Sequence, residues 1–187
     1  MPTIRAYRPS DETRWLQCRV LGFLPTNYYD DVKVAKTRLI PGSIELVAEA
    51  GDEIVGILDV EIDGDAATID TIAVHPAAQR RGIASALLDG ALRRLPPTVR
   101  TIDAWTREDA AANAWYDSAG FHENYRYLHV YVGEGDPPLP GPPGMSPAIS
   151  SFHHAPIERE SEVRGAYRRV YVCRQYLRGL DGITSTN

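Results

Sequence analysis

The sequence contains no long hydrophobic run and no segment that resembles a secretory signal. Its apolar stretches are all far shorter than the roughly 20 residues that a membrane-spanning helix needs. Residues 1–8 lack the continuous apolar core of a signal peptide and lead directly into a patterned strand. We therefore expect a cytoplasmic protein with no membrane partner.

Cysteine and basic charge are scarce as well. Cys18 and Cys173 are the only cysteines, and their apolar or aromatic neighbours predict that both are buried as small hydrophobic side chains. No metal-ligand spacing surrounds either residue, so we expect no metal site. The formal net charge is -5, whereas a nucleic-acid-binding surface normally shows a basic excess, so no nucleic acid partner is expected. A local basic site for a phosphorylated ligand remains compatible with this charge.

The length and composition of the chain fit one compact domain. With 187 residues, of which 43% are hydrophobic and 24% charged, the sequence resembles an average soluble domain. We expect a single domain over residues 1–187. A proline-rich and glycine-rich insertion over residues 133–163 is expected between the last two strands, as a long loop that is either disordered or folded as a cover.

Hydrophobic periodicity predicts a mixed α/β fold. Strict alternation and the turn signals at residues 51–52 and 63–65 predict an antiparallel meander of three strands in the first half of the chain. Spacing of three and four residues between apolar positions indicates the helices. The expected strands are 4–8, 44–50, 54–62, 67–74, 101–105, 124–132 and 168–176, and the expected helices are 12–21, 28–39, 83–95 and 109–118.

The most informative segment is a strand, a tight turn and a helix over residues 69–95. The first helical turn presents backbone amides without intrahelical acceptors, and the helix dipole adds partial positive charge there, so the arrangement suits a pyrophosphate. Gly82 lets the backbone approach such a ligand closely, Ala84 keeps the next position small, and Arg80 and Arg81 add positive charge at the rim.

Two motifs, one in this segment and one about thirty residues later, resemble those of the GNAT superfamily of acetyltransferases. Residues 79–84, Gln-Arg-Arg-Gly-Ile-Ala, match every position of the family's main motif, and residues 112–121, Ala-Asn-Ala-Trp-Tyr-Asp-Ser-Ala-Gly-Phe, are similar to its second element. The resemblance spans about residues 3–132, with residues 168–176 as the last strand. It implies a mostly antiparallel, splayed central sheet flanked by helices, with acetyl-coenzyme A as cosubstrate.

The resemblance also implies an activity and a set of cofactor-binding residues. The activity would be N-acetyl transfer to a primary amine, by direct attack within a ternary complex. The family often has Asn where this chain has Asp109, and Asn113 follows one helical turn later, so either residue could contact coenzyme A. The cofactor-binding residues implied are Ile72, Ala73, Val74, Gln79, Arg80, Arg81, Gly82, Ile83, Ala84, Ser85, Asp109, Asn113 and Tyr116.

The resemblance further implies two catalytic contributions. The backbone amide of Val74 would polarise the thioester carbonyl, and Tyr116 would protonate the departing thiolate. An alternative for Tyr116 is a packing role beside Trp115 on an amphipathic helix.

The family does not define the general base, and the hairpin at residues 63–65 suggests one. A two-residue or four-residue loop pairs Ile62 with Ala67 and therefore Asp59 with Asp70, with Glu61 next along the same face. Two facing carboxylates raise the pKa of one of them, which makes Asp70 the first candidate for the base and Glu61 the second. A solvated face is the alternative, and a three-residue loop would shift the register and separate the pair.

The acceptor is the least defined part of the hypothesis. A stripe of Tyr125, Tyr127, His129 and Tyr131 predicts either a half-buried strand or an acceptor wall, the latter joined by Tyr28 and Tyr29. The acceptor could be a small-molecule or peptide amine, and a homodimer is left open. Transfer of a longer acyl group and a coenzyme A-binding scaffold without turnover are the alternatives in function.

Overall fold

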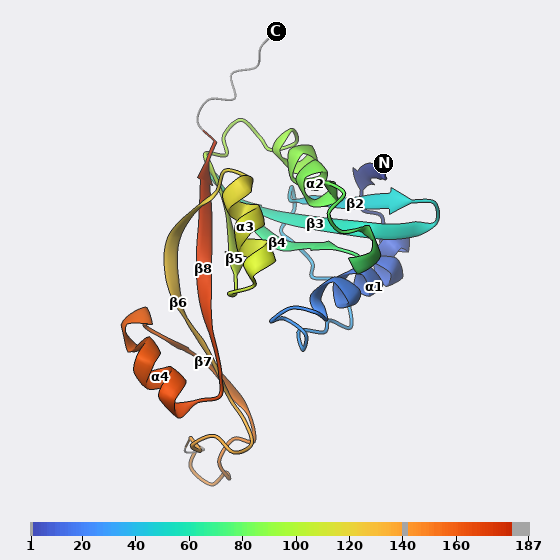
Figure 1. The fold of residues 1–187 in the computed structure, drawn as a ribbon. Coiled ribbons are helices and arrows are strands. Elements are labelled where there is room, and N and C mark those ends of the chain that lie inside the picture. Colours follow the sequence, from blue (N-terminus) through green and yellow to red (C-terminus); the bar gives the residue numbers. More distant parts are fainter. Residues whose placement is uncertain (1, 140–141, 181–187) are drawn as a thin grey trace.

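The computed structural model describes residues 2–139 and 142–180, which form one open sheet with helices on both faces (Figure 1). Three short 3-10 turns, at Pro9–Asp11, Pro76–Ala78 and Ile157–Arg159, precede α1, the turn into α2, and α4. The strands are β1 (Thr3–Ala6), β2 (Ile44–Ala50), β3 (Glu53–Asp63), β4 (Ala66–Val74), β5 (Thr101–Thr106), β6 (His122–Val132), β7 (Ser151–Ala155) and β8 (Arg169–Gly179). The helices are α1 (Glu12–Phe23), α2 (Ile83–Leu92), α3 (Ala110–Ser118) and α4 (Glu160–Ala166).

The sheet order is β1-β2-β3-β4-β5-β8-β6-β7. Every neighbouring pair is antiparallel except β4 and β5, which run parallel. The predicted mixed α/β fold with a mostly antiparallel sheet is therefore confirmed.

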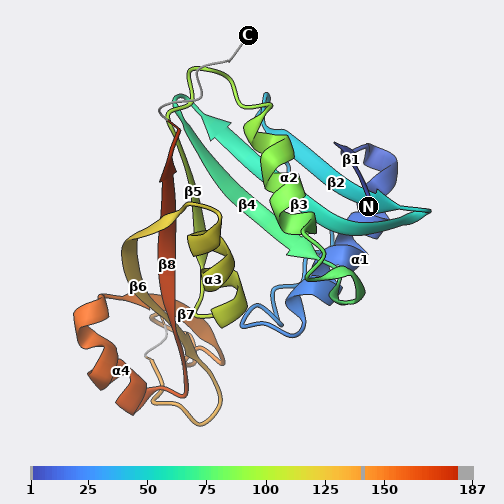
Figure 2. The ribbon, with the colours of Figure 1, turned by 45° about the horizontal axis from the view of Figure 1, so that its top comes forward.

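The parallel pair is short, and the sheet splays apart beyond it. β4 pairs with β5 only from Ala66 to Ile69, opposite residues 101–104. Beyond Ile69 the two strands diverge, as Figure 2 shows, and no pair joins the rest of β4 to β5 within the described residues. The sheet thus consists of a first half, β1 to β4, and a second half, β5 to β8, joined by a seam of four residue pairs.

Helices α1 and α2 cover opposite faces of the first half. Leu58 and Val60 on β3 belong to the buried cluster of Leu87 on α2, whereas Ile57 belongs to the buried cluster of Trp15 on α1. This alternation follows from the two-residue period of a strand that is buried on both faces.

In the second half, α3 and α4 share one face. Tyr116 of α3 lies in the cluster with Tyr176 on β8, and Val163 of α4 lies in the cluster with Val172 on the same strand. Residues 172 and 176 have the same parity, so both helices pack on the α2 side. The opposite face of this half carries the aromatic side chains of β6.

The segment from residue 24 to 43, which we call the strap, is irregular, so the predicted helix over residues 28–39 is wrong. Local turns satisfy some of its backbone groups, and side chains from outside the segment satisfy others. The guanidinium of Arg19 donates to the carbonyl oxygen of Asp31, and the amide of Lys36 donates to the carboxylate of Glu12 at 2.9 Å. These long-range partners replace the hydrogen bonds that a helix would have formed.

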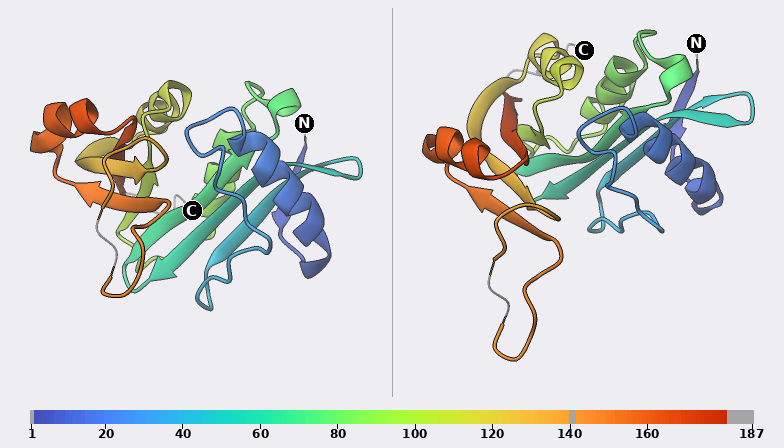
Figure 3. Two further views of the ribbon diagram at one scale, coloured as in Figure 1. Left: turned by 90° about the horizontal axis from the view of Figure 1, so that it is seen from below. Right: turned by 60° about the horizontal axis from the view of Figure 1, so that its bottom comes forward.

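The connection between β6 and β8 contains more regular structure than the sequence predicted. β7 lies at the edge of the sheet and pairs with Leu128–Val132 of β6, and α4 follows it. The prolines lie before β7 or directly after it at Pro156, which fits their exclusion from strand interiors. The loop between β6 and β7 extends away from the sheet (Figure 3). Residues 140–141 within this loop lie outside the described residues.

Two expectations drawn from scarce features can be compared with the structure. Both Cys18 and Cys173 are buried and free, as predicted. Within residues 2–139 and 142–180, no helix has the length and apolar character needed to cross a membrane.

Candidate active site

The hairpin between β3 and β4 corrects the expected carboxylate pair. Ile62 pairs with Ala67 as predicted, but a β-bulge then shifts the register, so that Asp59 lies opposite Thr71. Asp70 is the additional residue of the bulge. The prediction that Asp59 faces Asp70 across the strands is therefore wrong.

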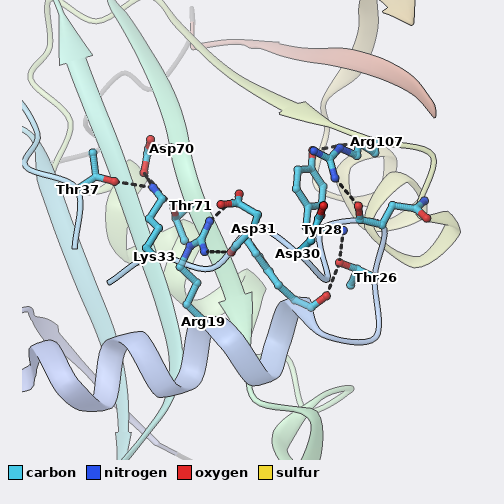
Figure 4. A network of polar contacts seen from close by, with 12 residues as sticks. Arg19, Thr26, Tyr28, Asp30, Asp31, Lys33, Thr37, Asp70, Thr71 and Arg107 are labelled. Atoms are coloured by element: carbon cyan, nitrogen blue, oxygen red, sulfur yellow. Dashed lines mark hydrogen bonds and ion pairs between the residues drawn. The ribbon is translucent and has the colours of Figure 1, made fainter. Parts of the chain in front are cut away.

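The two carboxylates have very different surroundings. Asp59 is fully buried, and its Oδ2 lies 2.8 Å from the ammonium group of Lys36 in the strap. Burial raises the pKa of Asp59 to about 6, although Lys36 opposes the shift. Asp70 is partly exposed, accepts a hydrogen bond from the Thr71 hydroxyl at 3.0 Å, and lies 3.8 Å from Lys33 (Figure 4).

Glu61, the second candidate for the base, lies farther from the splay. It pairs with Thr68, inside the region where β4 and β5 are still joined. Its carboxylate accepts a hydrogen bond from the backbone amide of Ile40 at 3.3 Å.

The end of β4 presents backbone amides to the gap between the sheet halves. The amide of His75 donates to the carbonyl of Val55 at 2.9 Å. Because hydrogen-bonding directions alternate along an antiparallel strand, the amides of Val74 and Ile72 point away from β3 and toward the splay. On the other face α1 approaches this strand end closely, since a Cβ added at Gly22 would lie 3.1 Å from the Cβ of Ala73.

The turn after β4 opens directly into α2. Gly82 is the N-cap of α2, with a left-handed φ of 75°, and Arg80 also has a positive φ of 60°. A Cβ added at Gly82 would meet no atom within 4 Å, so this side of the turn is open. The first helical hydrogen bond here runs from the amide of Ala86 to the carbonyl of Gly82. The amides of residues 83–85 therefore have no helical acceptor and can bind an anion.

Helix α3 faces this turn across the splay. The indole Nε1 of Trp115 donates to the hydroxyl of Ser85 at 3.2 Å, which joins α3 to α2. Asp109, the N-cap of α3, accepts the amide of Asn27 on Oδ1 at 2.9 Å. Its Oδ2 and the Oδ1 of Asn113 are buried without a hydrogen-bond partner in the described chain. Both oxygens could accept N–H donors from a ligand in the splay.

Tyr116 is deeply buried in the core between the two sheet halves. Its ring stacks on Tyr176 with centroids 5.2 Å apart and meets Phe121 edge-on at 5.4 Å. Ile72 and Val74 pack against the same buried cluster. Burial raises the pKa of the Tyr116 hydroxyl, which keeps it protonated at neutral pH.

The aromatic stripe on β6 is divided by exposure. Tyr125 is exposed and, with Tyr127 and Trp105 of β5, lines a shallow cavity of about 430 Å³. His129 is buried, and burial together with the charge of Arg107 lowers its pKa to about 4. Part of the stripe is thus a packed wall and part is open.

Arg107 and Arg169 bring the strap tyrosines to this wall. Sequence patterns do not indicate Arg107, and they indicate only a solvated edge for Arg169. The guanidinium of Arg107 lies 4.0 Å from the ring centre of Tyr28 and 5.1 Å from that of Tyr131. Arg169 similarly lies between Tyr29 and Tyr131, at 4.6 Å and 3.9 Å. Neither arginine belongs to a motif, so only the tertiary contacts reveal them. No group of three or more His, Cys, Asp or Glu residues in the described ranges could hold a metal ion.

Comparison with known proteins shows what this arrangement is similar to. Residues 41–123 match the family model described as an acetyltransferase (GNAT) domain. No curated protein matches the sequence.

Several solved structures share the fold. The ribosomal-protein-S18-alanine N-acetyltransferase of Escherichia coli is 16% identical, with a TM-score of 0.62 over 100% of this chain and 99% of that one. NAA60 of Arabidopsis thaliana, in complex with a bisubstrate analogue, is 15% identical, with a TM-score of 0.61 over 97% and 99%. A GNAT family acetyltransferase from Elizabethkingia anophelis with acetyl-CoA bound is 15% identical, with a TM-score of 0.52 over 95% and 97%. At these identities the likeness shows the fold.

Proposed function

We propose that this protein transfers an acetyl group from acetyl-coenzyme A to a primary amine. The premise is the match of residues 41–123 to the acetyltransferase (GNAT) domain. The observation that carries the proposal is the splay itself. The amides of Ile72 and Val74 face an opening in the sheet, and this opening lies beside the anion-binding turn at Gly82.

The residues around the splay fit acetyl-coenzyme A, which supplies the acetyl group as a thioester. Residues 79–85 would bind the pyrophosphate through backbone amides, with Arg80 and Arg81 adding charge. The backbone of residues 72–74 would pair with the amides of the pantetheine arm. The unpartnered oxygens of Asp109 and Asn113 would accept N–H donors from the same arm, so both residues, rather than one, are assigned to the cofactor. The acetyl-CoA-bound relative from Elizabethkingia anophelis supports this assignment by its fold.

Three groups of this chain would then act on the reacting atoms. The Val74 amide would donate to the carbonyl oxygen as negative charge develops there. Asp70, partly exposed on the strap side, would accept a proton from the attacking amine, directly or through water, as the new C–N bond forms. The Tyr116 hydroxyl would give its proton to the sulfur as the C–S bond breaks. Asp59 is buried in an ion pair with Lys36, and Glu61 lies where the strands are still paired. Asp70 is therefore better placed than either to act as the base.

The test is a turnover assay with acetyl-coenzyme A and a panel of small amines, amino acids and peptides with free N-termini. Release of free coenzyme A that depends on one of the amines, with the acetylated amine identified by mass spectrometry, would support the proposal. Tight binding without release for every amine would instead indicate a coenzyme A-binding scaffold. Faster release from longer acyl thioesters would indicate a different acyltransferase.

A further inference from the structure

Arg107 follows β5, at the start of the turn into α3, and its buried guanidinium has only neutral hydrogen-bond partners among those that the structure gives. It is 6% exposed. It donates to the carbonyl of Asn27, to the hydroxyl of Tyr131, and to Nδ1 of His129 at 3.4 Å. A buried guanidinium needs several well-placed acceptors to compensate for lost hydration. Arg107 finds one of them in the strap.

The same turn holds two consecutive strap residues through further contacts. The backbone amide of Arg107 donates to the hydroxyl of Tyr28 at 3.1 Å, and the Tyr28 ring lies under the guanidinium. The carboxylate of Asp109 accepts the amide of Asn27. Asn27 is therefore held at both its amide and its carbonyl by residues that flank one turn (Figure 4 shows Arg107 and Tyr28).

The other end of the strap is attached to the first half of the sheet. Lys36 pairs with Asp59 at 2.8 Å, and Lys33 lies 3.8 Å from Asp70. Arg19 of α1 pairs with Asp31 at 2.9 Å. The strap thus crosses from one half of the sheet to the other on the α1 side, whereas the cofactor turn at Gly82 belongs to α2 on the opposite face.

Resting on the proposed function, we infer that Arg107 is a positioning residue that fixes the strap as one wall of the acceptor site. The end of β4 can be approached from either face of the sheet. Helices α2 and α3 flank one approach, so an amine would arrive from the α1 side, where it must pass the strap. Arg107 holds Asn27 and Tyr28 of this wall, and among the described residues its side-chain hydrogen bonds and ring contacts reach none of those assigned to the cofactor. A lysine could not replace it. The planar guanidinium directs its donors to three separate acceptors, and a compact ammonium group cannot reach all three.

The experiment compares wild type with Arg107→Lys in three measurements. We expect the Michaelis constant for the best amine of the panel to rise about tenfold or more, while kcat changes less than about threefold. Acetyl-coenzyme A affinity should stay within about twofold of wild type by calorimetry. Hydrogen exchange of the strap amides in the free protein should become at least about tenfold faster.

Two further variants keep the test informative. Tyr28→Phe removes one hydroxyl and keeps the ring, so it should fold and show the same changes at smaller amplitude. Arg164→Lys is the matched control, because Arg164 pairs with the neighbouring Glu108 at 2.8 Å but belongs to α4 on the other face. This control should leave all three measurements unchanged.

The inference would be overturned by wild-type exchange in the strap of Arg107→Lys, or by lost acetyl-coenzyme A binding in a folded Arg107→Lys protein. An unchanged Michaelis constant with faster exchange would likewise remove the acceptor role. If wild type acetylates no amine, the proposed function fails and the acceptor role falls with it. The exchange measurement still decides whether Arg107 holds the strap.

Discussion

Two replacements of Gly82 test two properties of the anion-binding turn separately. One property is its left-handed backbone, and the other is the absence of negative charge beside the anion. In Gly82→Ala, the added Cβ meets no atom within 4 Å, so the only cost is the left-handed φ of 75°. That conformation costs a non-glycine residue roughly 1–2 kcal/mol, which should appear as an equal loss of unfolding free energy. Affinity for acetyl-coenzyme A should fall only slightly.

Gly82→Asp has a similar backbone cost and adds a negative charge where the pyrophosphate would lie. Two unit charges 4 Å apart interact by about 4 kcal/mol at an effective dielectric constant of 20. Because Gly82 is exposed, we expect about half of that, ~2 kcal/mol, which corresponds to roughly 30-fold weaker binding.

Calorimetric titration of wild type and both variants with acetyl-coenzyme A measures this difference, and thermal unfolding shows whether each variant is folded. The gap in affinity between the Asp and Ala variants should narrow as salt is added, because exposed charges are screened. If folded Gly82→Asp binds as tightly as Gly82→Ala, the pyrophosphate does not lie at this turn.

The remaining predictions concern the acid–base groups and the β6–β7 connection. Asp70→Asn and Tyr116→Phe should each lower kcat, because one removes the proposed base and the other the proposed acid; full activity in Asp70→Asn would refute the base, and full activity in Tyr116→Phe would leave only its packing role. Asp59→Asn removes a carboxyl group whose pKa, about 6, lies above its free-chain value of 3.8, so the folded wild type binds this proton more tightly than the unfolded chain does. The unfolding free energy of wild type should therefore fall relative to the variant, by up to about 3 kcal/mol, as the pH rises from about 4 to about 7; denaturant titrations that show a constant difference would contradict this. Replacing residues 137–147 with a short glycine-serine link should leave acetyl-coenzyme A affinity unchanged and alter the acceptor Michaelis constant or the oligomeric state, and loss of cofactor binding in the folded variant would show that this loop belongs to the cofactor site.

Local patterns predicted those parts of the molecule whose geometry depends on neighbouring residues in the chain. The turn at Gly82 needs a left-handed residue before a helix, and a strand, a glycine and an apolar helical repeat are all visible in the sequence. The hairpin pairing of Ile62 with Ala67 was likewise predictable from its turn residues.

The features that could not be predicted depend on single residues or on distant partners. The bulge at Asp70 inserts one residue into β4 without any change in composition, yet it separates the expected carboxylate pair. The strap has enough apolar periodicity to suggest a helix, but two of its carbonyl groups accept hydrogen bonds from Arg19 and Arg107, which lie outside it. No local sequence pattern indicates such distant partners.

The seam between β4 and β5 also divides the chain itself. Every strand on one side comes from residues 3–74, and every strand on the other comes from residues 101–179. A cut in the connection at residues 93–100 would leave each ladder except the seam within a single fragment. The protein therefore has a natural boundary for two complementing fragments, and a molecule bound in the splay would bridge them across the seam.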